Sequence, residues 1–421
     1  MAQESSRDML GRAALLPVAE ALRILDEHLD DVRVGSEQVG LDQALGRITA
    51  APISSPEDLP PHPRSTMDGF AVRAADTFGA TEAMPAYLTV SGEVCMGEFP
   101  RTGPQPGSCY RIATGGLLPP GTDSVVMLEH TVPVDESMIE VNHGVGCGSN
   151  VINTGDDIPA GAEALPAGHR ITPRDLGLLA GLGIDTVTVH QRVRAGILAT
   201  GDEIVDWQDT PAPGQVRNIN SVALAALVRE QGHRARDYGI VADQRKPFST
   251  RVRQALDEND LVIFSGSSSV GMRDLGEQVL SELGKPGILV HGVALKPGKP
   301  IIIAACGPKI LFGLPGHPVS AIVCFDLFIT RALNMLSGLM DPLPRAPEVC
   351  GRLMRPLNSA AGRRDYVRVR LEPTEQGWDI YPVLAKSGAV SSLSRAHGYL
   401  IIDEHIQGLA QYSRVCVQLF R

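Results

Sequence analysis

Two short polar segments of the chain carry residue types that could bind a phosphate and the divalent cation that accompanies it. In residues 200–203, Asp202 and Glu203 are adjacent carboxylates, and hard oxygen ligands of this kind suit Mg²⁺. Residues 265–271 combine serine with glycine, so hydroxyls and backbone N–H groups could cradle an anion. Asp274 follows this loop and could either cap the next helix or ligate the same cation. A plain turn is the alternative for both segments.

A third polar run places two lysines beside a turn. Lys296 and Lys299 flank a Pro-Gly pair, which suits phosphate or another oxyanion, with a plain surface turn as the alternative. The chain holds only six lysines against 32 arginines, so two lysines within four residues are unusual for this composition. The run is therefore a candidate for binding an anionic substrate.

Apolar strands that alternate with helices must position these segments. Strands are expected at residues 195–199, 237–241, 261–264, 301–304 and 310–312, and helices at 221–231, 248–256, 275–283 and 319–336. This alternation is typical of a doubly wound, mostly parallel sheet, in which ligands bind beyond the carboxyl ends of the strands. Residues 200–203, 265–271 and 313–318 all follow such strands. The sequence therefore predicts one ligand site built from three loops.

The flanking segments have shorter elements. Residues 14–30 have the apolar spacing of a helix, and residues 160–183 turn helical again, with Thr172 and Pro173 as N-cap and first residue. Short β-type runs at 87–90, 124–128 and 138–141 lie between Gly/Pro turns and indicate a small β domain. Similar runs at 366–371, 378–383 and 415–420 indicate a second one, after a linker at 341–344.

Composition excludes several classes of protein. The 421 residues carry a net charge of −10 and only 4% aromatics, so neither a basic face nor a base-stacking platform for nucleic acid is expected. The seven cysteines are scattered without a CxxC pair, which predicts no disulfide framework and no zinc site and favours a reduced, cytoplasmic protein. No apolar stretch approaches about 18 residues, so no membrane span is expected, nor a signal peptide.

Five motifs in order resemble the MoeA family of molybdopterin molybdenumtransferases, to which the gephyrin E domain is related. They are Ser65-Thr-Met-Asp-Gly-Phe-Ala-Val-Arg73, Thr200-Gly-Asp-Glu203, the loop 265–271 with Asp274, Lys296-Pro-Gly-Lys-Pro300 and Gly313-Leu-Pro-Gly-His-Pro-Val-Ser320. The resemblance covers residues 14–421. It implies an α/β plus β multidomain fold, with an elongated N-terminal dimerisation region (1–60 and 151–190), an inserted small β domain (61–150), a doubly wound MogA-like α/β domain that binds molybdopterin (191–340) and a C-terminal β-barrel-like domain (341–421).

The resemblance also implies an activity. Members of the family take adenylylated molybdopterin and molybdate, need Mg²⁺, and release AMP and molybdenum cofactor. They are typically homodimers, with the site between the α/β domain of one subunit and the N-terminal region of the other. Three alternatives are a tungstate-inserting paralogue, a non-enzymatic molybdopterin-binding scaffold of the gephyrin E type, and a nucleotidyltransferase that adenylylates molybdopterin. Retention of the acidic residues and Lys296 argues against a scaffold, and the flanking β domains argue against the nucleotidyltransferase.

The family's functional residues carry over motif by motif. The resemblance implies catalytic roles for Asp68, Thr114, Asp157, Glu203, Asp243, Asp274 and Lys296, with Glu203 and Asp274 holding Mg²⁺ and Asp68 the best candidate for a general base. It implies substrate binding by Gly266, Ser267, Ser268, Ser269, Gly271, Lys299, Pro315, Pro318, Arg368 and Ser387, of which Ser387 is the weakest match. Lys, Arg368 and Ser387 are suitable donors to an oxyanion such as molybdate.

Three positions depart from the family's pattern. Ser267 stands where a second glycine is usual, His317 replaces the asparagine of Pro-Gly-Asn-Pro, and Gly292 replaces a lysine four residues before Lys296. These changes concern ligand handling. They leave open whether molybdate or tungstate is the preferred oxyanion.

Overall fold

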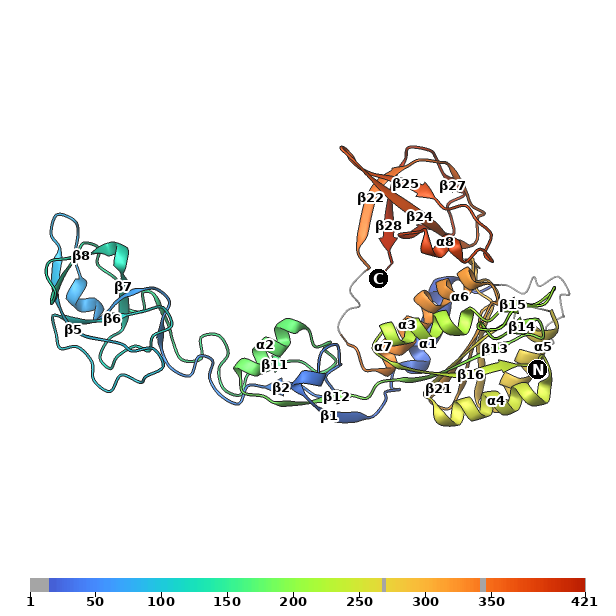
Figure 1. The fold of residues 1–421 in the computed structure, drawn as a ribbon, viewed down its shortest axis with the longest axis horizontal. Helices are drawn as coiled ribbons and strands as arrows, with labels where there is room; N and C mark the ends of the chain where they lie inside the picture. The colour runs from blue at the N-terminus through green and yellow to red at the C-terminus, as the bar shows by residue number, and fades with distance from the viewer. Residues whose placement is uncertain (1–14, 267–269, 341–345, 421) are drawn as a thin grey trace, which may run out of the picture.

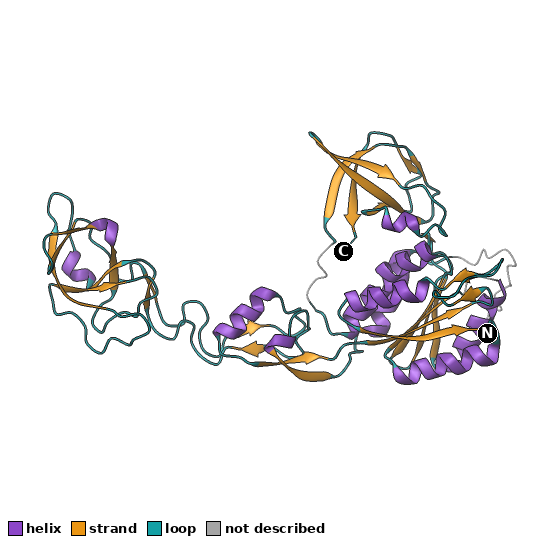
Figure 2. Ribbon diagram, viewed as in Figure 1, coloured by secondary structure: helices purple, strands orange, loops and turns teal. Residues whose placement is uncertain are grey.

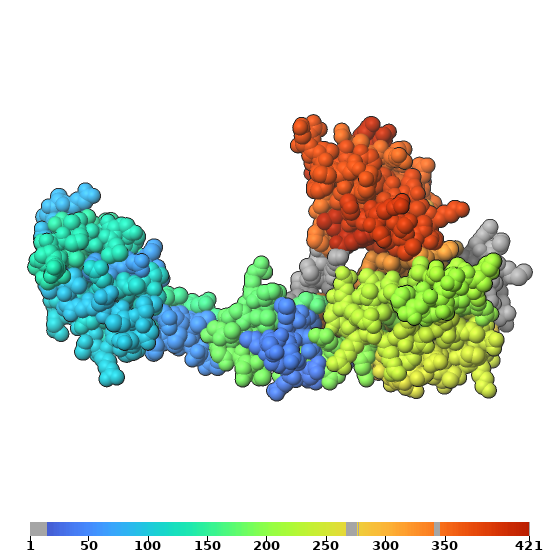
Figure 3. Space-filling view, viewed as in Figure 1, coloured from blue at the N-terminus to red at the C-terminus, as the bar shows by residue number. Residues whose placement is uncertain are grey.

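The computed structural model describes residues 15–266, 270–340 and 346–420, with backbone alone at 270–275 and 277. The molecule is elongated (Figure 1). A small β domain forms one end, an extended arm and a short lobe follow, and the α/β domain with the C-terminal barrel beside it forms the other end. The space-filling view shows the arm as the narrow part between the two ends (Figure 3). Residues of the inserted β domain are thereby kept apart from those of the α/β domain in the same chain.

The α/β domain is built on a six-stranded sheet in the order β16-β13-β17-β21-β20-β18. Four neighbouring strands pair in parallel: β16 (Arg234–Val241), β13 (Arg194–Thr200), β17 (Leu261–Ser265) and β21 (Lys309–Leu314). Strand β20 (Ile302–Cys306) is antiparallel to β21, and β18 (Pro286–His291) is antiparallel to β20. Strands β13 and β17 are almost entirely buried, as expected of parallel strands covered on both faces. The predicted mostly parallel sheet is confirmed.

Helices cover both faces of this sheet (Figure 2). One face packs against α1 (Val18–Leu29), α3 (Asn220–Glu230), α6 (Pro318–Cys324) and α7 (Thr330–Leu336). The other packs against α4 (Arg245–Glu258) and α5 (Val270–Leu283). Helix α1 comes from the N-terminal segment, yet its apolar face (Val18, Ala21, Leu25, Leu29) is buried in the core of the α/β domain. The doubly wound arrangement expected from the alternating pattern is therefore present.

Helices α6 and α7 are joined by a π-helical turn, η4 (Phe325–Ile329), into one apolar run. This run, Pro318–Leu336, is long and apolar enough to cross a membrane by length and composition. However, 67% of its most apolar window is buried inside the protein. Its apolar residues are thus accounted for by packing on the sheet, as in a core helix.

The inserted β domain contains a six-stranded sheet in the order β7-β4-β6-β5-β9-β8. Its strands are β4 (Gly69–Val72), β5 (Ala86–Glu93), β6 (Ser108–Ile112), β7 (Ser124–Met127), β8 (Thr131–Pro133) and β9 (Met138–Val141). Two antiparallel segments, β3 (Arg64–Ser65) and β10 (Val151–Ile152), form the arm that leads to it. The chain thus enters and leaves this domain through paired extended segments.

A short lobe lies between the arm and the α/β domain. It pairs β1 (Ser36–Gly40) with β12 (Thr186–His190), and β2 (Ile53–Ser54) with β11 (Glu163–Leu165), beside α2 (Pro173–Gly181). A capping box between Thr172 and Asp175 begins α2, as the sequence predicts. The prediction of helix from residue 160 onwards is wrong, because Gly161 and Gly168 adopt positive φ and residues 163–165 pair with β2 instead.

The C-terminal domain is a closed five-stranded barrel. Its strands are β22 (Glu348–Leu353), β24 (Arg364–Thr374), β25 (Gly377–Pro382), β26 (Gly398–Ile402) and β28 (Arg414–Leu419), and β24 pairs with both β25 and β26 to close the ring. A two-residue strand of the α/β domain, β19 (Leu295–Lys296), pairs in parallel with β24.

The remaining short elements of the chain are η1 (Leu41–Gln43), η2 (Ala74–Thr77), η3 (Leu128–His130), β14 (Ile204–Val205), β15 (Val216–Arg217), β23 (Leu357–Asn358), β27 (Gly408–Leu409) and α8 (Ser391–Ser394).

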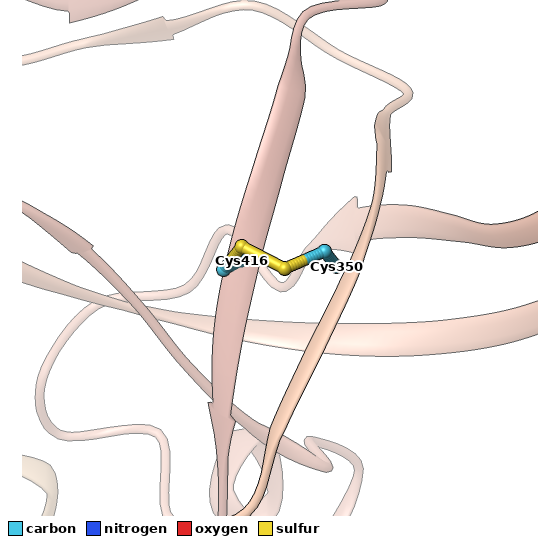
Figure 4. Close-up of a disulfide and its surroundings, with 2 residues drawn as sticks. All are labelled: Cys350 and Cys416. Carbon is cyan, nitrogen blue, oxygen red and sulfur yellow. A yellow bond between two sulfur atoms is a disulfide. The ribbon is translucent and has the colours of Figure 1, made fainter.

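One disulfide corrects the expectation of a chain without such bonds. Cys350 on β22 and Cys416 on β28 are directly opposite each other in the antiparallel pair, and their sulfurs are bonded (Figure 4). The Cα atoms lie 4.0 Å apart, although 66 residues separate the two cysteines in sequence. Spacing alone gave no signal, because the pairing depends on how the barrel closes. The other five cysteines are free.

Candidate functional site

The three predicted loops meet at the carboxyl edge of the α/β sheet. Strands β13, β17 and β21 are neighbours and end at Thr200, Ser265 and Leu314. The Thr200 hydroxyl donates to the Ser265 carbonyl at 3.3 Å, and the Gly266 N–H donates to the Leu314 carbonyl at 3.2 Å. The expectation that these loops begin side by side at one edge of the sheet is therefore confirmed.

Gly266 begins the predicted phosphate loop in a conformation that favours glycine. Its φ is +123°, and a Cβ here would lie 2.1 Å from the carbonyl oxygen of Thr200. Only glycine allows this close approach between the two strand ends. Ser267, Ser268 and Ser269 lie outside the described residues. Gly271 and Asp274 lie in the first turns of α5, where the side chain of Asp274 is also outside them.

Carboxylates gather at the ends of β13 and β16. The backbone N–H of Asp243 donates to Asp202 Oδ1 at 3.1 Å. Burial, reinforced by the negative charges of Asp202 and Glu203, raises the pKa of Asp243 to about 6. Among the described residues, Asp243 Oδ1 is buried without a hydrogen-bond partner. Sequence reasoning named Glu203 and Asp243 singly, and the structure shows that they belong to one acidic cluster.

This cluster fits a hard divalent cation. Mg²⁺ keeps several waters and is bound by one or two carboxylates together with substrate phosphates, so a complete protein cage is not required. In the part of the chain that the structure describes, no group of three or more His, Cys, Asp and Glu side chains could hold a metal by itself. The orphaned oxygen of Asp243 and the repulsion among the carboxylates are what a bound cation would relieve.

The two lysines lie where β19 joins the barrel. Lys296 is the second residue of β19, and its ammonium lies 3.4 Å from Asp365 Oδ2 on β24. The Lys296 side chain is 54% exposed, which leaves it accessible to a ligand. Lys299 is exposed in the following turn, where its carbonyl accepts a hydrogen bond from Val293 N at 3.0 Å.

The loop after β21 links the α/β domain to the barrel. Pro315 is buried, and Pro318 is the first residue of α6. Between them, His317 Nδ1 lies 3.1 Å from the hydroxyl of Ser387 in the barrel. The Ser387 carbonyl also accepts a hydrogen bond from Val319 N at 3.3 Å. Ser387, the residue with the weakest match to the family pattern, therefore lies beside the loop that contains Pro315 and Pro318.

Arg368 is buried within the barrel, on β24. It donates to the Ala385 carbonyl at 2.7 Å and to the Ser392 hydroxyl, whereas its Nε is buried with no partner among the described residues. Burial lowers the pKa of Arg368 from its ordinary value, and the opposing influence of Tyr399 is smaller. The guanidinium has five N–H donors, so each terminal nitrogen keeps one further donor, whereas the enclosed Nε is not accessible to a ligand.

Asp68, Thr114 and Asp157 are not brought to this edge within one chain. Asp68 directly precedes β4, at the opposite end of the molecule from β13 and β21 (Figure 1). Its Oδ1 accepts from the backbone N–H and the hydroxyl of Thr114, at 2.7 and 2.8 Å. These two bonds lower the pKa of Asp68. Asp157 is exposed beside the arm, and its N–H donates to the Leu59 carbonyl at 3.1 Å.

Three family descriptions match consecutive parts of the chain. They are the MoeA N-terminal region (domain I and II) over residues 16–183, the probable molybdopterin binding domain over 196–335, and the MoeA C-terminal region (domain IV) over 351–420. A molybdopterin biosynthesis protein of Methanocaldococcus jannaschii is 34% identical, over 97% of this chain and 98% of its own length. The chain belongs to the MoeA family.

Two further members of the MoeA family are similar to this chain over nearly its whole length. The molybdopterin molybdenumtransferase of Bacillus subtilis is 30% identical over 98% of this chain and 96% of its own. The crystal structure of the molybdopterin biosynthesis MoeA protein from Pyrococcus horikoshii OT3 has a TM-score of 0.81 at 30% identity, covering 96% of this chain and all (100%) of that one. The multidomain fold, with its MogA-like domain and C-terminal barrel, is therefore the MoeA architecture.

Sequence reasoning missed several polar residues that shape this MoeA site. Asn220 at the start of α3 donates to the Gly316 carbonyl at 2.9 Å and so fixes the loop after β21. Tyr399 of the barrel donates to Asp326 Oδ2 on η4 at 3.1 Å. Asp365, three residues before Arg368 on β24, was not among the predicted residues. No local pattern identifies these contacts, because each joins elements far apart in sequence.

Proposed function

We propose that this MoeA protein is a molybdopterin molybdenumtransferase that inserts molybdate into adenylylated molybdopterin and releases AMP. The observation that carries the proposal is the meeting of the Gly266 loop and the Asp202–Glu203–Asp243 cluster at one sheet edge. Family membership supports it, since relatives such as the Bacillus subtilis protein are named molybdopterin molybdenumtransferase. Cleavage of a pyrophosphate needs charge neutralisation and positioning more than a nucleophilic side chain.

The acidic cluster would hold Mg²⁺ in this proposal. Glu203 and Asp243, with Asp274 from α5, are the candidate ligands. When bound, the cation would neutralise charge on the phosphates of the adenylylated substrate. The chain itself supplies the close backbone approach at Gly266 and a lysine ammonium at Lys296, both of which suit phosphate oxygens.

The oxyanion would be bound by donors from both domains. Arg368 and Ser387 come from the barrel, and Lys296 and Lys299 come from the run that joins it. Arg368 is buried and Ser387 is partly buried, so little water competes for their hydrogen bonds to an anion, whereas the exposed Lys296 and Lys299 contribute positive charge. We therefore propose molybdate as the preferred ligand of this group, with tungstate as the alternative.

We further propose that the working enzyme is a homodimer. Support comes from the separation within one chain of the Asp68–Thr114 pair from the sheet edge, which a second copy would resolve (Figure 1). The lowered pKa of Asp68 makes it a weak general base at neutral pH. Asp68 and Asp157 would instead act as fixed negative charges or hydrogen-bond acceptors toward the partner's ligand.

A turnover assay tests the function. Purified protein is mixed with adenylylated molybdopterin, Mg²⁺ and either molybdate or tungstate, and AMP release and cofactor formation are followed. AMP release with molybdate supports the proposal, and release with tungstate alone identifies the tungstate enzyme. Folded protein that binds the pterin but releases no AMP with either oxyanion contradicts the enzymatic function and favours a scaffold.

We propose the cytoplasm as the location. The five free cysteines support a reducing compartment, whereas the exposed Cys350–Cys416 pair is the feature that argues the other way. Thiol labelling of rapidly quenched cells would show which state this pair has in the native compartment. A fully oxidised pair in cells would contradict the cytoplasmic placement.

A further inference from the structure

Asp365 is a buried carboxylate between two cations at the junction of the α/β domain and the barrel. Its side chain is 3% exposed. Its Oδ1 accepts from Arg363 Nε at 2.9 Å, and its Oδ2 lies 3.4 Å from Lys296 Nζ. Arg363 belongs to the barrel and Lys296 to the α/β domain, so Asp365 connects charges from both.

The backbone fixes this contact. Strands β19 and β24 pair in parallel, with Leu295 opposite Arg364 and Lys296 opposite Asp365. The Arg364 N–H donates to the Ala294 carbonyl at 2.9 Å. Because the ladder holds the two backbones side by side, the Asp365 carboxylate has one defined position relative to the stem of Lys296.

A lysine needs such a restraint to act as a binding group. Its ammonium ends a four-carbon stem, and ordering this stem costs about 2 kcal/mol of side-chain entropy. Lys296 is half exposed, so without a partner it would sample many rotamers. The ammonium has three donors, and one bond to Asp365 leaves two for the oxygens of an anion. Arg363 compensates the charge of Asp365 separately, so the carboxylate can keep its place when the lysine turns toward a ligand.

We propose that Asp365 is a positioning residue that acts through Lys296 to set the affinity of the site for its oxyanion group. This inference rests on the binding role of Lys296 in the proposed function. The group is either the molybdate ion or a phosphate of the adenylylated pterin, which present the same chemistry to an ammonium. Separate KM values for the two substrates distinguish them.

The test compares the variant Asp365→Asn with a matched control. Asp365→Asn keeps the shape but removes the charge, and we expect the KM of the oxyanion substrate to rise about tenfold while kcat stays within about twofold. The control is Asp379→Asn, another mostly buried carboxylate of the barrel, which pairs with Arg352 at 3.1 Å and does not contact the α/β domain through that pair. It should leave both KM values unchanged, although both variants lose a barrel ion pair.

A second variant guards against failure to fold. Asp365→Glu keeps the charge beside Arg363 and displaces the carboxylate by one methylene, so the KM should rise by less, about threefold. If circular dichroism shows that Asp365→Asn is unfolded, the KM of Asp365→Glu tests the proposal instead. An unchanged or lowered KM in the folded variant overturns the proposal.

Lys296→Ala separates the inference from the proposed function. If Lys296→Ala changes neither KM, the binding role of Lys296 fails and the inference fails with it. If Lys296→Ala raises a KM but Asp365→Asn does not, only the inference is overturned. In the double variant, Asp365→Asn should add no further rise, because its partner is gone. A full additional rise on the Lys296→Ala background would show that Asp365 does not act through Lys296.

Discussion

The two ends of the molecule each hold an aspartate to which the MoeA resemblance assigns a role, and the surroundings of the two are opposite. In the inserted β domain, Asp68 is exposed and accepts two hydrogen bonds from Thr114, which lower its pKa. At the α/β sheet edge, Asp243 is partly buried beside Asp202 and Glu203, which raises its pKa to about 6. The anion of Asp68 is therefore stabilised by its own hydrogen bonds, whereas burial and the neighbouring carboxylates disfavour the anion of Asp243.

The difference follows from how each group is built. The inserted domain joins Asp68 and Thr114 through donors that stabilise the anion. The sheet edge instead collects carboxylates from the ends of two neighbouring strands, where they repel each other. The comparison predicts that Mg²⁺ changes the behaviour of the carboxylates at the sheet edge and leaves the pKa of Asp68 unchanged.

Removing the carboxylates proposed as Mg²⁺ ligands should have the largest effect. We expect Glu203→Gln and Asp274→Asn each to lower Mg²⁺-dependent AMP release by at least about a hundredfold, because phosphate charge would be poorly neutralised. Single-turnover assays at several Mg²⁺ concentrations measure this. Circular dichroism serves as the control for folding, and full activity of both variants would remove the metal role assigned to these residues.

Gly266→Ala should affect folding as well as activity. A Cβ would lie 2.1 Å from the Thr200 carbonyl in a backbone with φ of +123°, so the strand ends must move apart. We expect a loss of about 2–4 kcal/mol in the free energy of unfolding. Gly276→Ala, in helix α5 with no described atom within 4 Å of the added methyl, is the matched control. Equal stability of the two variants would contradict the close approach described here.

Asp243→Asn should stabilise the apo protein at neutral pH. A carboxyl whose pKa is raised in the folded state contributes stability at low pH that is lost as pH rises from about 4 through about 6. The variant should therefore lack this loss and be about 1 kcal/mol more stable than the parent at pH 8, after allowance for solvent screening. Denaturant unfolding between pH 4 and 8 without Mg²⁺ measures it. A parent whose stability does not fall over this range would refute the assignment.

Thr114→Val should have the smallest effect. It should raise the pKa of Asp68, which the two hydrogen bonds from Thr114 lower in the parent protein. Losing the hydroxyl donor leaves only the backbone bond to Asp68, so the pKa of Asp68 should rise toward its ordinary value. Its titration by NMR between pH 2 and 6 measures the shift, with Asp135 as an internal reference because its own hydrogen bonds to Ser137 are untouched. No metal dependence of this pKa is expected, and a strong one would contradict the contrast between the two ends.

Local pattern determined much of the fold and part of the site. Strands β13, β17 and β21 were predicted because a buried parallel strand is a continuous apolar run, and the polar loops that follow them could be located by the same reasoning. The cap at Thr172 was predicted because it depends on residues three apart. The helix expected from residue 160 failed because two turns with positive φ and a strand pairing overrode the propensity of the segment.

Contacts between distant residues were decided only by the tertiary structure. The resemblance to the MoeA family predicted roles for Asp68, Thr114, Lys296 and Arg368 from the sequence alone, since each match to the family is local. Three contacts had no such signal: Asp365 beside Lys296, Asn220 on the Gly316 carbonyl, and the Cys350–Cys416 bond. The first depends on the pairing of β19 with β24, the second on how α3 packs beside the loop after β21, and the third on the pairing of β22 with β28. Residue types and spacing therefore determined what chemistry the chain carries, and packing decided which charges face each other.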